Sequence, residues 1–368
     1  TLDTSANSDG ETLDLTGGTL TNVSGGILNI ATGNGFGGRT VVIGANALSN
    51  AAGGTIQVAH DATFRGGTVL NAGAVTISIG KTATIASGAT LVQSTGGTYT
   101  GSGTLLIADG ATFRFDANGT IASGLTVSLG SGGSGATWSN ANGAIATIAG
   151  TLNAKSGTIS SNLSIVSGGA LQAFNTSGVM LTGNVSNAAG GTILIEDNDG
   201  NGSGTSLFVS GTLNNAGTIT LDTSANSDGE TLDLTGGALN ISTGGTLDLA
   251  NGNGLGDRNV ILGTSNLNVA GAINAHHSST FTLGNASIDV LNLGTFTIDN
   301  GVAVGIASGG TGAIRVESGA TLTVNGTLNL NGHDVYEVGT IVGKANINLG
   351  GGYYVYITPQ NVAGRTLA

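Results

Sequence analysis

The chain repeats its own opening. Residues Thr1–Gly18 recur without a change at Thr220–Gly237. The correspondence continues without a gap, so that Gly33–Arg39 matches Gly252–Arg258 at the same separation. An ordinary globular domain does not restart in mid-chain, because each of its segments packs in a different environment. A verbatim restart is typical of a repeat array, in which each unit packs mainly on its neighbours.

Between these landmarks, short strand-like segments alternate with glycine-centred breaks. Apolar residues occupy every second position in Glu11–Leu15, Arg39–Ile43 and Leu125–Leu129, with mostly polar residues between them. This is the period of a strand that buries one face. The breaks hold Gly, which tolerates a positive φ. No segment carries the 3.6-residue stripe or the capping box of a helix.

Strands this short at even spacing occur in sandwiches, barrels and solenoids, and the restart favours the solenoid. We predict an all-β fold, a parallel β-helix (β-solenoid) with about three short strands and roughly 20–25 residues per coil, right-handed like other parallel crossovers. The predicted domains are a first solenoid module at 1–219, a truncated second copy at 220–349 that continues the same solenoid, and a Tyr-rich segment at 350–368.

The composition indicates a folded, acidic chain. Hydrophobic residues make up 39% of the 368 residues, charged residues make up 8%, and the formal net charge is −12. The nine Lys and Arg are scattered singly, whereas nucleic-acid binding needs clustered cations, so no nucleic-acid partner is expected. No apolar run is long enough for a transmembrane segment. The start at Thr1 without a leader suggests a processed or excised segment, and the absence of Cys favours a bacterial surface protein.

Segments such as Gly18–Gly26 and Gly211–Ile219 resemble the β-strand repeats of bacterial surface proteins, including autotransporter passengers and filamentous-haemagglutinin-like exoproteins. The resemblance covers nearly the whole chain. It implies a right-handed β-helix that is extracellular or held at the Gram-negative cell surface, in association with the outer membrane, for adhesion, biofilm or matrix building. The C-terminal membrane barrel and the N-terminal secretion domain of those families are not recognisable here.

The best candidate metal site is the segment Asp197-Asn-Asp-Gly-Asn201. Oxygen ligands from Asp197, Asp199 and Asn201 would converge around a Gly turn, as Ca²⁺ requires. The complete EF-hand spacing would need an acidic residue where Phe208 stands, so the site is at most partial. The alternative is an Asx-rich turn without metal. No other cofactor is predicted.

A Tyr-rich strand near the C-terminus is the candidate for a cap or a docking segment: Tyr353, Tyr354, Val355, Tyr356 and Ile357. The open ends of a β-helix carry unpaired strand edges, which pair with another subunit unless they are covered. End-to-end self-association is therefore the expected partner interaction.

The remaining chemistry-bearing residues are interpreted as structural. Arg39 and Arg258 correspond through the repeat, which predicts a structural role on the coil surface. A flexible break is expected at Ser131–Gly135. The four histidines are expected on the surface or in loops: His60, His276, His277 and His333.

Enzymatic activity is not predicted. Glycan hydrolysis needs two carboxyl groups about 5–10 Å apart in a groove. Asp14 and Asp116 have no evident aromatic or basic neighbours, and Phe113 and Phe115 are interpreted as core residues. We predict a non-enzymatic extracellular structural protein, either the shaft of a surface adhesin or the subunit of a self-assembling filament or biofilm matrix. The alternative is a β-helical protein that binds or cleaves carbohydrate, of the tailspike or lyase kind. Host or matrix glycans are further candidate partners.

Overall fold

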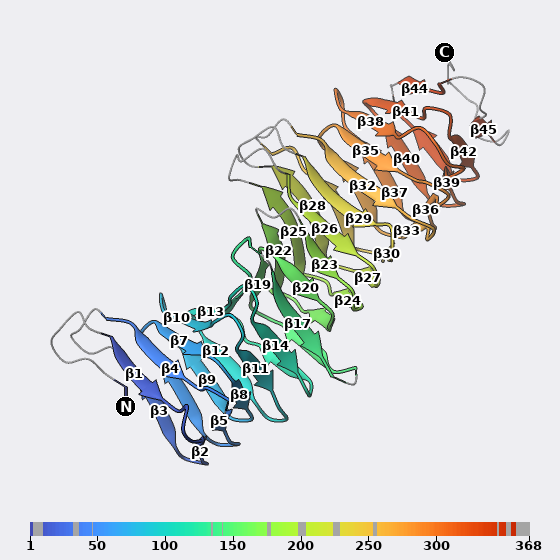
Figure 1. Ribbon diagram of the computed structural model, residues 1–368. Helices are drawn as coiled ribbons and strands as arrows, with labels where there is room; N and C mark the ends of the chain where they lie inside the picture. Colours follow the sequence, from blue (N-terminus) through green and yellow to red (C-terminus); the bar gives the residue numbers. More distant parts are fainter. Residues whose placement is uncertain are drawn as a thin grey trace. The chain divides into compact units, whose positions relative to one another are not determined.

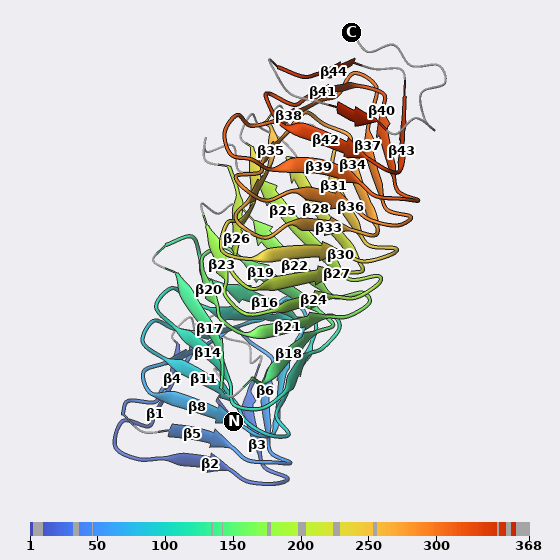
Figure 2. The same cartoon turned by 90° about the vertical axis from the view of Figure 1, so that its right-hand side faces the viewer.

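The computed structural model describes residues 1–2, 10–31, 37–45, 47–133, 135–141, 143–174, 178–197, 204–223, 229–252, 256–343 and 346–350, and the backbone of 355–357. These residues fall into two compact units, Thr1–Gln172 and Ala173–Ala368. Every regular element in the described ranges is a strand, and Figures 1 and 2 show the strands stacked in layers. No helix in the described part of the chain could span a membrane.

The first unit contains three parallel sheets, named here 1a, 1b and 1c. Sheet 1a consists of β1 (Glu11–Asp14), β4 (Arg39–Val42), β7 (Ala62–Arg65), β10 (Thr82–Ile85), β13 (Thr104–Ile107), β16 (Thr126–Leu129) and β19 (Thr151–Ala154). Sheet 1b consists of β2 (Leu20–Asn22), β5 (Ala47–Asn50), β8 (Thr68–Asn71), β11 (Thr90–Gln93), β14 (Thr112–Phe115), β17 (Ala136–Asn140) and β20 (Gly157–Ile159). Sheet 1c consists of β3 (Ile27–Ile30), β6 (Thr55–Val58), β9 (Ala74–Ile77), β12 (Thr98–Gly101), β15 (Gly119–Ile121), β18 (Ile145–Ile148) and β21 (Asn162–Ile165).

The second unit repeats the arrangement in sheets 2a, 2b and 2c, and β22 (Ala170–Phe174) lies at the boundary between the units. Sheet 2a consists of β25 (Thr192–Asp197), β28 (Thr218–Thr223), β31 (Thr246–Leu249), β34 (Ala272–Ala275), β37 (Thr295–Ile298), β40 (Thr321–Val324) and β43 (Thr340–Val342). Sheet 2b consists of β23 (Val179–Leu181), β26 (Ser206–Val209), β29 (Glu230–Leu234), β32 (Arg258–Leu262), β35 (Ser279–Thr282), β38 (Ala303–Ile306), β41 (Thr327–Asn329) and β44 (Asn346–Asn348). Sheet 2c consists of β24 (Val185–Asn187), β27 (Thr212–Asn215), β30 (Ala238–Ile241), β33 (Leu267–Val269), β36 (Ile288–Val290), β39 (Ala313–Val316), β42 (Asp334–Glu337) and β45 (Val355–Ile357).

Within each unit a strand pairs in parallel with the third strand after it, which defines a coil of three strands and confirms the predicted parallel β-helix. The paired residues Glu11 and Arg39 are 28 positions apart, whereas Ile145 and Asn162 are 17 apart. This range is wider than the predicted coil length. Because the strands keep three to six residues, the variation lies in the corner loops, which can lengthen without disturbing the stacked strands.

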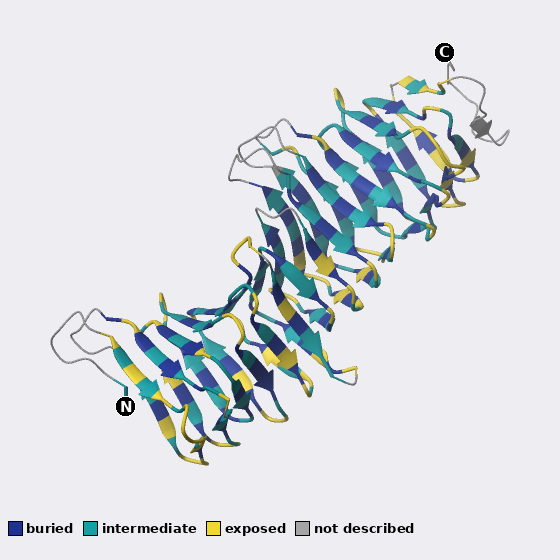
Figure 3. Cartoon of the chain, viewed as in Figure 1, coloured by how far each residue is buried: buried dark blue, intermediate teal, exposed yellow. Residues whose placement is uncertain are grey.

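Alternation along each strand places apolar side chains inside the coil, where they form columns from one coil to the next. Figure 3 shows the resulting alternation of buried and more exposed residues. In sheet 1a one column runs through fully or almost fully buried side chains: Val41, Phe64, Ile85, Ile107 and Leu129. Each apolar side chain therefore packs on its counterparts above and below, which is how a narrow coil obtains a continuous core.

One interior column of sheet 1b is polar. Asn22 Nδ2 donates to Asn50 Oδ1 at 2.8 Å, Asn50 Nδ2 donates to Asn71 Oδ1 at 2.8 Å, and Asn71 Nδ2 lies 3.5 Å from Gln93 Oε1. The stacked amides satisfy one another, as buried polar groups require. The turn beside this ladder needs a glycine, because a Cβ on Gly73 would lie 2.7 Å from Asn50 Nδ2.

An aromatic cluster follows the amide ladder. Gln93 is opposite Phe115 in the register of β11 and β14. Phe115 stacks on Trp138 with ring centroids 5.3 Å apart, and Phe113 meets the edges of both Trp138 and Tyr99. All four rings are buried, which confirms the prediction that Phe113 and Phe115 are core residues.

The repeated sequence adopts the same local structure twice. Glu11 begins β1 and its counterpart Glu230 begins β29, twenty-eight strands later. Because a coil takes three strands, the second copy starts one strand further round the coil than the first. Its first residue, Thr220, lies inside β28 rather than at a break. The division at 219/220 thus marks a sequence repeat, and its role as a domain boundary stays a prediction.

Candidate functional site

The predicted calcium ligand Asp197 lies inside the coil. It is the last residue of β25, with 0% of its surface exposed. Asp199 and Asn201 lie outside the described residues. Within the ranges that the structure describes, no group of three or more His, Asp or Glu side chains is arranged to hold a metal ion. Calcium binding at this segment stays a prediction, and Asp197 belongs to a different cluster.

That cluster, called here the corner cluster, consists of Asp197, Asp222, Glu230 and Arg258. Glu230 and Arg258 are directly opposite in the register of β29 and β32, and each is 0% exposed. Arg258 Nη1 donates to the carbonyl oxygen of Gly256, and Nη2 lies 3.6 Å from Asp222 Oδ1. The expectation that Arg258 lies on the coil surface is wrong. Its strand places it on the inner face together with Val260 and Leu262.

The corner cluster makes few hydrogen bonds for a buried group of ionisable side chains. Arg258 Nε has no acceptor within the described part of the chain, and only backbone N–H groups, those of Glu230 and Asp197, lie near the Glu230 carboxylate, without a hydrogen bond of good geometry. Burial raises the pKa of Glu230 to about 8, against the opposing charge of Arg258 and with a smaller contribution from Asp197. Burial likewise lowers the pKa of Arg258. Burial therefore favours the protonated form of Glu230.

A second set of charges lies along sheet 2a, the sheet that carries Asp222 in β28. His276 Nδ1 is 2.7 Å from Asp299 Oδ2, and its Nε2 is 3.6 Å from Asp248 Oδ1. Partial burial raises the pKa of Asp248, His276 opposes this, and Asp222 adds to it. His276 is thus part of an outer charged row, close to the predicted surface position. His277 is also part-buried and close to its strand end, where its Nδ1 lies 3.2 Å from the Ser278 carbonyl oxygen.

The first copy of the repeat contains a matched pair. Glu11 is opposite Arg39 in the register of β1 and β4. Arg39 is 1% exposed, which again corrects the predicted surface position, whereas Glu11 is only half-buried. Arg39 Nη1 donates to the Gly37 carbonyl oxygen and lies 3.4 Å from His60 Nε2. Asp3, the counterpart of Asp222, lies outside the described residues.

The alternation of inward-facing and outward-facing residues along a strand could have predicted that both arginines are buried. Arg39 shares its alternation with Val41 and Ile43, and those two residues were expected to be buried. An arginine on the apolar face of a short strand points inward unless the strand is disrupted. The surface position was predicted because arginine is charged, and the alternation along the strand was not applied to it.

A third polar site holds the corner between β16 and β17. The carboxylate of Asp109 accepts the N–H groups of Ser131, Gly133 and Gly135, each at 3.2 Å, and the hydroxyl of Ser156 at 2.9 Å. The hydroxyl of Ser131, followed by the hydroxyl of Ser156 and the N–H groups of Ser131 and Gly133, lowers the pKa of Asp109 to about 2 against the opposing effect of partial burial. The Gly-rich segment expected to be a flexible break is thus held by one carboxylate wherever it is described.

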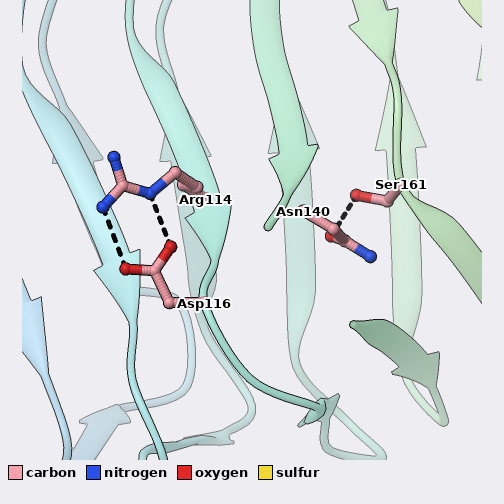
Figure 4. A network of polar contacts seen from close by, with 4 residues as sticks. All are labelled: Arg114, Asp116, Asn140 and Ser161. Carbon is pink, nitrogen blue, oxygen red and sulfur yellow. Dashed lines mark hydrogen bonds and ion pairs between the residues drawn. The ribbon is translucent and has the colours of Figure 1, made fainter. Parts of the chain in front are cut away.

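Figure 4 shows two further contacts of this part of the chain. Arg114 Nε and Nη2 donate to the two oxygens of Asp116 at 2.6 and 2.9 Å, and Ser161 Oγ donates to Asn140 Oδ1. Asp116 therefore has a basic neighbour, which the sequence interpretation did not find. The pair lies on the exposed face and consumes both carboxylate oxygens, so it resembles a surface ion pair rather than a catalytic carboxylate.

His333 lies in the loop between β41 and β42, one of the two positions predicted for it, but it is buried there, with 3% of its surface exposed. Its Nδ1 is 2.7 Å from the Gly312 carbonyl oxygen and its Nε2 is 2.9 Å from the Ala307 carbonyl oxygen. The ring thereby ties two points of the preceding coil together. Hydrogen bonding at a corner explains this burial, and the local pattern of the sequence does not reveal it.

The predicted terminal strand is present in part. Val355–Ile357 form β45, in which Val355 is opposite Val335 and Tyr356 is opposite Tyr336 of β42. Tyr353 and Tyr354 lie outside the described residues. The segment therefore adds a strand to sheet 2c, and its role as a cap or docking strand stays a prediction.

Comparison with known proteins gives no family. No family model matches the chain, and no curated protein matches it. Six chains of known structure match, among them a fragment of TibA hyper-glycosylated in a reaction catalysed by TibC. That match covers 95% of this chain and 98% of the TibA fragment, at 15% sequence identity and a TM-score of 0.27. Similarity at this level assigns neither a family nor a function.

Proposed function

We propose that the chain is a non-enzymatic extracellular structural protein, a rigid shaft of a surface adhesin or the subunit of a filament or matrix. The observation that carries the proposal is the uninterrupted parallel pairing of strands in each unit, with buried columns inside. Backbone ladders of this kind resist unfolding without disulfides, and the chain contains no Cys. The resemblance to bacterial β-strand-repeat proteins supports the extracellular setting.

The end coils support self-association. Inward-facing Leu13 and Leu20 are only half-buried, whereas their successors Val41 and Leu48 are fully buried. At the other end of the described solenoid, Ile347 is half-buried although Leu328, opposite it, is fully buried. The first and last described strands of these sheets therefore bury their inward side chains less than the strands beside them. An unpaired strand edge is a template for pairing with another chain, and self-association by such an edge is part of the proposal.

The enzymatic alternative has little support from the described residues. The carboxylates found close together are engaged by Arg258 or His276. Of the two carboxylates considered from the sequence, Asp14 ends β1, and Asp116 follows β14 in another sheet. Asp116 is bound by Arg114. None of these arrangements places two free carboxyl groups about 5–10 Å apart in a groove.

Electron microscopy of the purified chain, with and without a calcium chelator, tests the proposal. We expect slender rods of about 70–85 Å, or filaments built from them. Filaments that come apart only with chelator would show that assembly needs the predicted calcium site. Compact globular particles without a long axis would refute the proposed shaft, and depolymerisation of a polysaccharide by the same preparation would favour the enzymatic alternative.

A further inference from the structure

Two apolar side chains stand next to each other on the outer face of sheet 2b. Met180 in β23 is opposite Phe208 in β26, and both alternate with inward-facing residues. Met180 is 46% exposed and Phe208 is partly exposed. Neighbouring outward positions on these strands and on β29 are polar, with Ser206 opposite Thr231. An apolar pair on a polar face is the kind of exception that marks a binding surface.

The Phe208 ring lies across the backbone of the preceding coil. A Cβ on Gly178 would come within 2.9 Å of the ring atom Cε2 and 3.5 Å of Cδ2. The ring therefore leans over Gly178 and occupies the space that a side chain would take there. A glycine at this position leaves room for the ring, which remains partly exposed.

A carboxylate completes the row. Asp233 in β29 is opposite Phe208, one strand further along. Asp233 Oδ1 accepts the N–H of Thr235 at 2.8 Å and the Thr235 hydroxyl. No hydrogen bond to Oδ2 is found in the described residues. This fixes the carboxylate and leaves one oxygen for a ligand. Met180, Phe208 and Asp233 thus form a strip across three strands, about 10 Å long.

We propose that this strip, called here the outer strip, binds a cationic amino-sugar polymer. An aromatic ring next to a carboxylate is suited to an ammonium group, which the ring attracts through its π face and the carboxylate binds by charge-assisted hydrogen bonds. Met180 and Phe208 offer an apolar surface to the C–H face of a pyranose, and Ser206 and Thr231 offer hydroxyls. The net charge of −12 favours a cationic over an acidic polysaccharide.

A linear polymer suits an open face better than a small ligand does. The strip lies on an open sheet face whose rows continue from coil to coil, so a linear chain could extend along the row beyond the strip, whereas a closed pocket would hold a single small ligand. A lysine-rich protein segment offers the same ammonium group. Such a segment lacks the sugar hydroxyl groups that could form hydrogen bonds with the flanking Ser206 and Thr231. We therefore assign the strip to an amino-sugar polymer.

The first copy of the repeat supplies a matched control. Asp14 Oδ1 accepts the N–H of Thr16 at 2.8 Å, as Asp233 does with Thr235, and Asp14 is opposite Val42 as Asp233 is opposite Ile261. β1 is the first described strand of its sheet, so no described strand places an aromatic side chain opposite Asp14 as β26 places Phe208 opposite Asp233. D14N removes the same charge without touching the strip.

The experiment is calorimetric titration of the full chain with glucosamine oligosaccharides prepared from chitosan, at physiological ionic strength. We expect F208A and D233N each to raise the dissociation constant about fivefold or more. D14N and I145A, the second removing a 41% exposed apolar side chain elsewhere, should leave it unchanged. Fully N-acetylated oligosaccharides should bind at least about tenfold more weakly, because they lack the ammonium group.

Three results would overturn the proposal: unchanged binding in F208A, an equal loss in D14N and D233N, or tighter binding of a lysine-rich peptide with the same dependence on Phe208. The last result would assign the strip to a protein partner. All four variants alter outward-facing side chains, so circular dichroism should confirm an unchanged fold. The outcome is independent of the shaft proposal, since rods or filaments form by strand pairing whether or not the strip binds sugar.

Discussion

Glu230 lies opposite Arg258 inside the coil, and the two ionisable side chains are both completely buried. A pair of this kind normally carries a full set of hydrogen bonds, because each charge loses its hydration on burial. Here Glu230 makes no hydrogen bond of good geometry within the described residues, and burial raises its pKa to about 8 although the Arg258 charge and nearby backbone N–H groups oppose the rise. The stability of this part of the second unit should therefore depend on pH in an unusual range.

We expect E230Q to make the second unit less sensitive to alkali. The folded-state pKa of Glu230 is raised above its unfolded value, so the contribution of the bound proton is complete below about pH 4.5. It is lost as pH rises through about 8. The loss amounts to about 2–5 kcal/mol on this basis. Hydrogen exchange of the β29 amides between pH 5 and 9 measures it, and E230Q should flatten the profile.

The first copy provides the control for this prediction. Glu11 occupies the same register position but is only half-buried. E11Q should leave the pH dependence of exchange in β1 and β4 almost unchanged. A wild-type second unit whose exchange protection is constant from pH 5 to 9 would contradict the argument from burial.

The amide ladder of the first unit should contribute strongly to its stability. Asn50 accepts a hydrogen bond from Asn22 and donates to both Asn71 and the Ala74 carbonyl oxygen. N50A leaves these buried partners unsatisfied and should cost about 2–4 kcal/mol. Urea unfolding followed by the fluorescence of Trp138, which lies in the same unit, measures the change. The outward-facing neighbour gives the control: S49A should alter stability by less than about 0.5 kcal/mol.

Removing the charge of Asp109 should loosen the corner that it holds. Its carboxylate accepts three backbone N–H groups and two hydroxyls, which lower its pKa to about 2. Its stabilising effect is present above the unfolded pKa near 4 and is lost as pH falls through about 2. Because the group is partly exposed, solvent screening reduces the effect to about 1 kcal/mol.

D109N should accordingly lower the urea midpoint at pH 7 and change it little at pH 2. The exposed pair of Arg114 and Asp116 gives a comparison, since D116N removes a carboxylate from the same unit but breaks only a surface ion pair. An equal effect of D109N and D116N at pH 7 would show that the backbone donors around Asp109 contribute nothing.

The fold was predictable because its signal repeats. Alternation in segments such as Arg39–Ile43 sets the buried face, and the restart at Thr220 excludes folds whose segments each pack differently. The corners were harder, because their contacts join residues from different coils. His333 is held by Ala307 and Gly312, and Asp109 is held by Ser131 and Ser156. Such pairings depend on coil lengths, which vary from coil to coil and leave no local pattern.

The corner cluster was predictable in part. Periodicity alone places Arg39 and Arg258 inside the coil, and the repeat predicts that each has a Glu counterpart at the same distance. What the sequence does not contain is the difference between the copies. Glu230 is covered on both sides by neighbouring coils of its sheet, whereas Glu11 is in the first described strand of its sheet. Identical residues thus acquire different burial from their place in the array.

That difference gives a test of whether the buried pair stabilises the protein at all. R258M leaves Asp222, Asp197 and Glu230 without their cation, and we expect it to destabilise the second unit by about 3–5 kcal/mol at pH 9. The double variant R258M/E230L replaces the pair by apolar side chains of similar size on a face that already holds Val260 and Leu262. It should recover most of the loss, because an apolar pair needs no hydrogen bonds. Hydrogen exchange of β29 and β32 measures both variants. A double variant as unstable as R258M would mean that Arg258 acts mainly on Asp197 and Asp222, and that Glu230 opposite it contributes little.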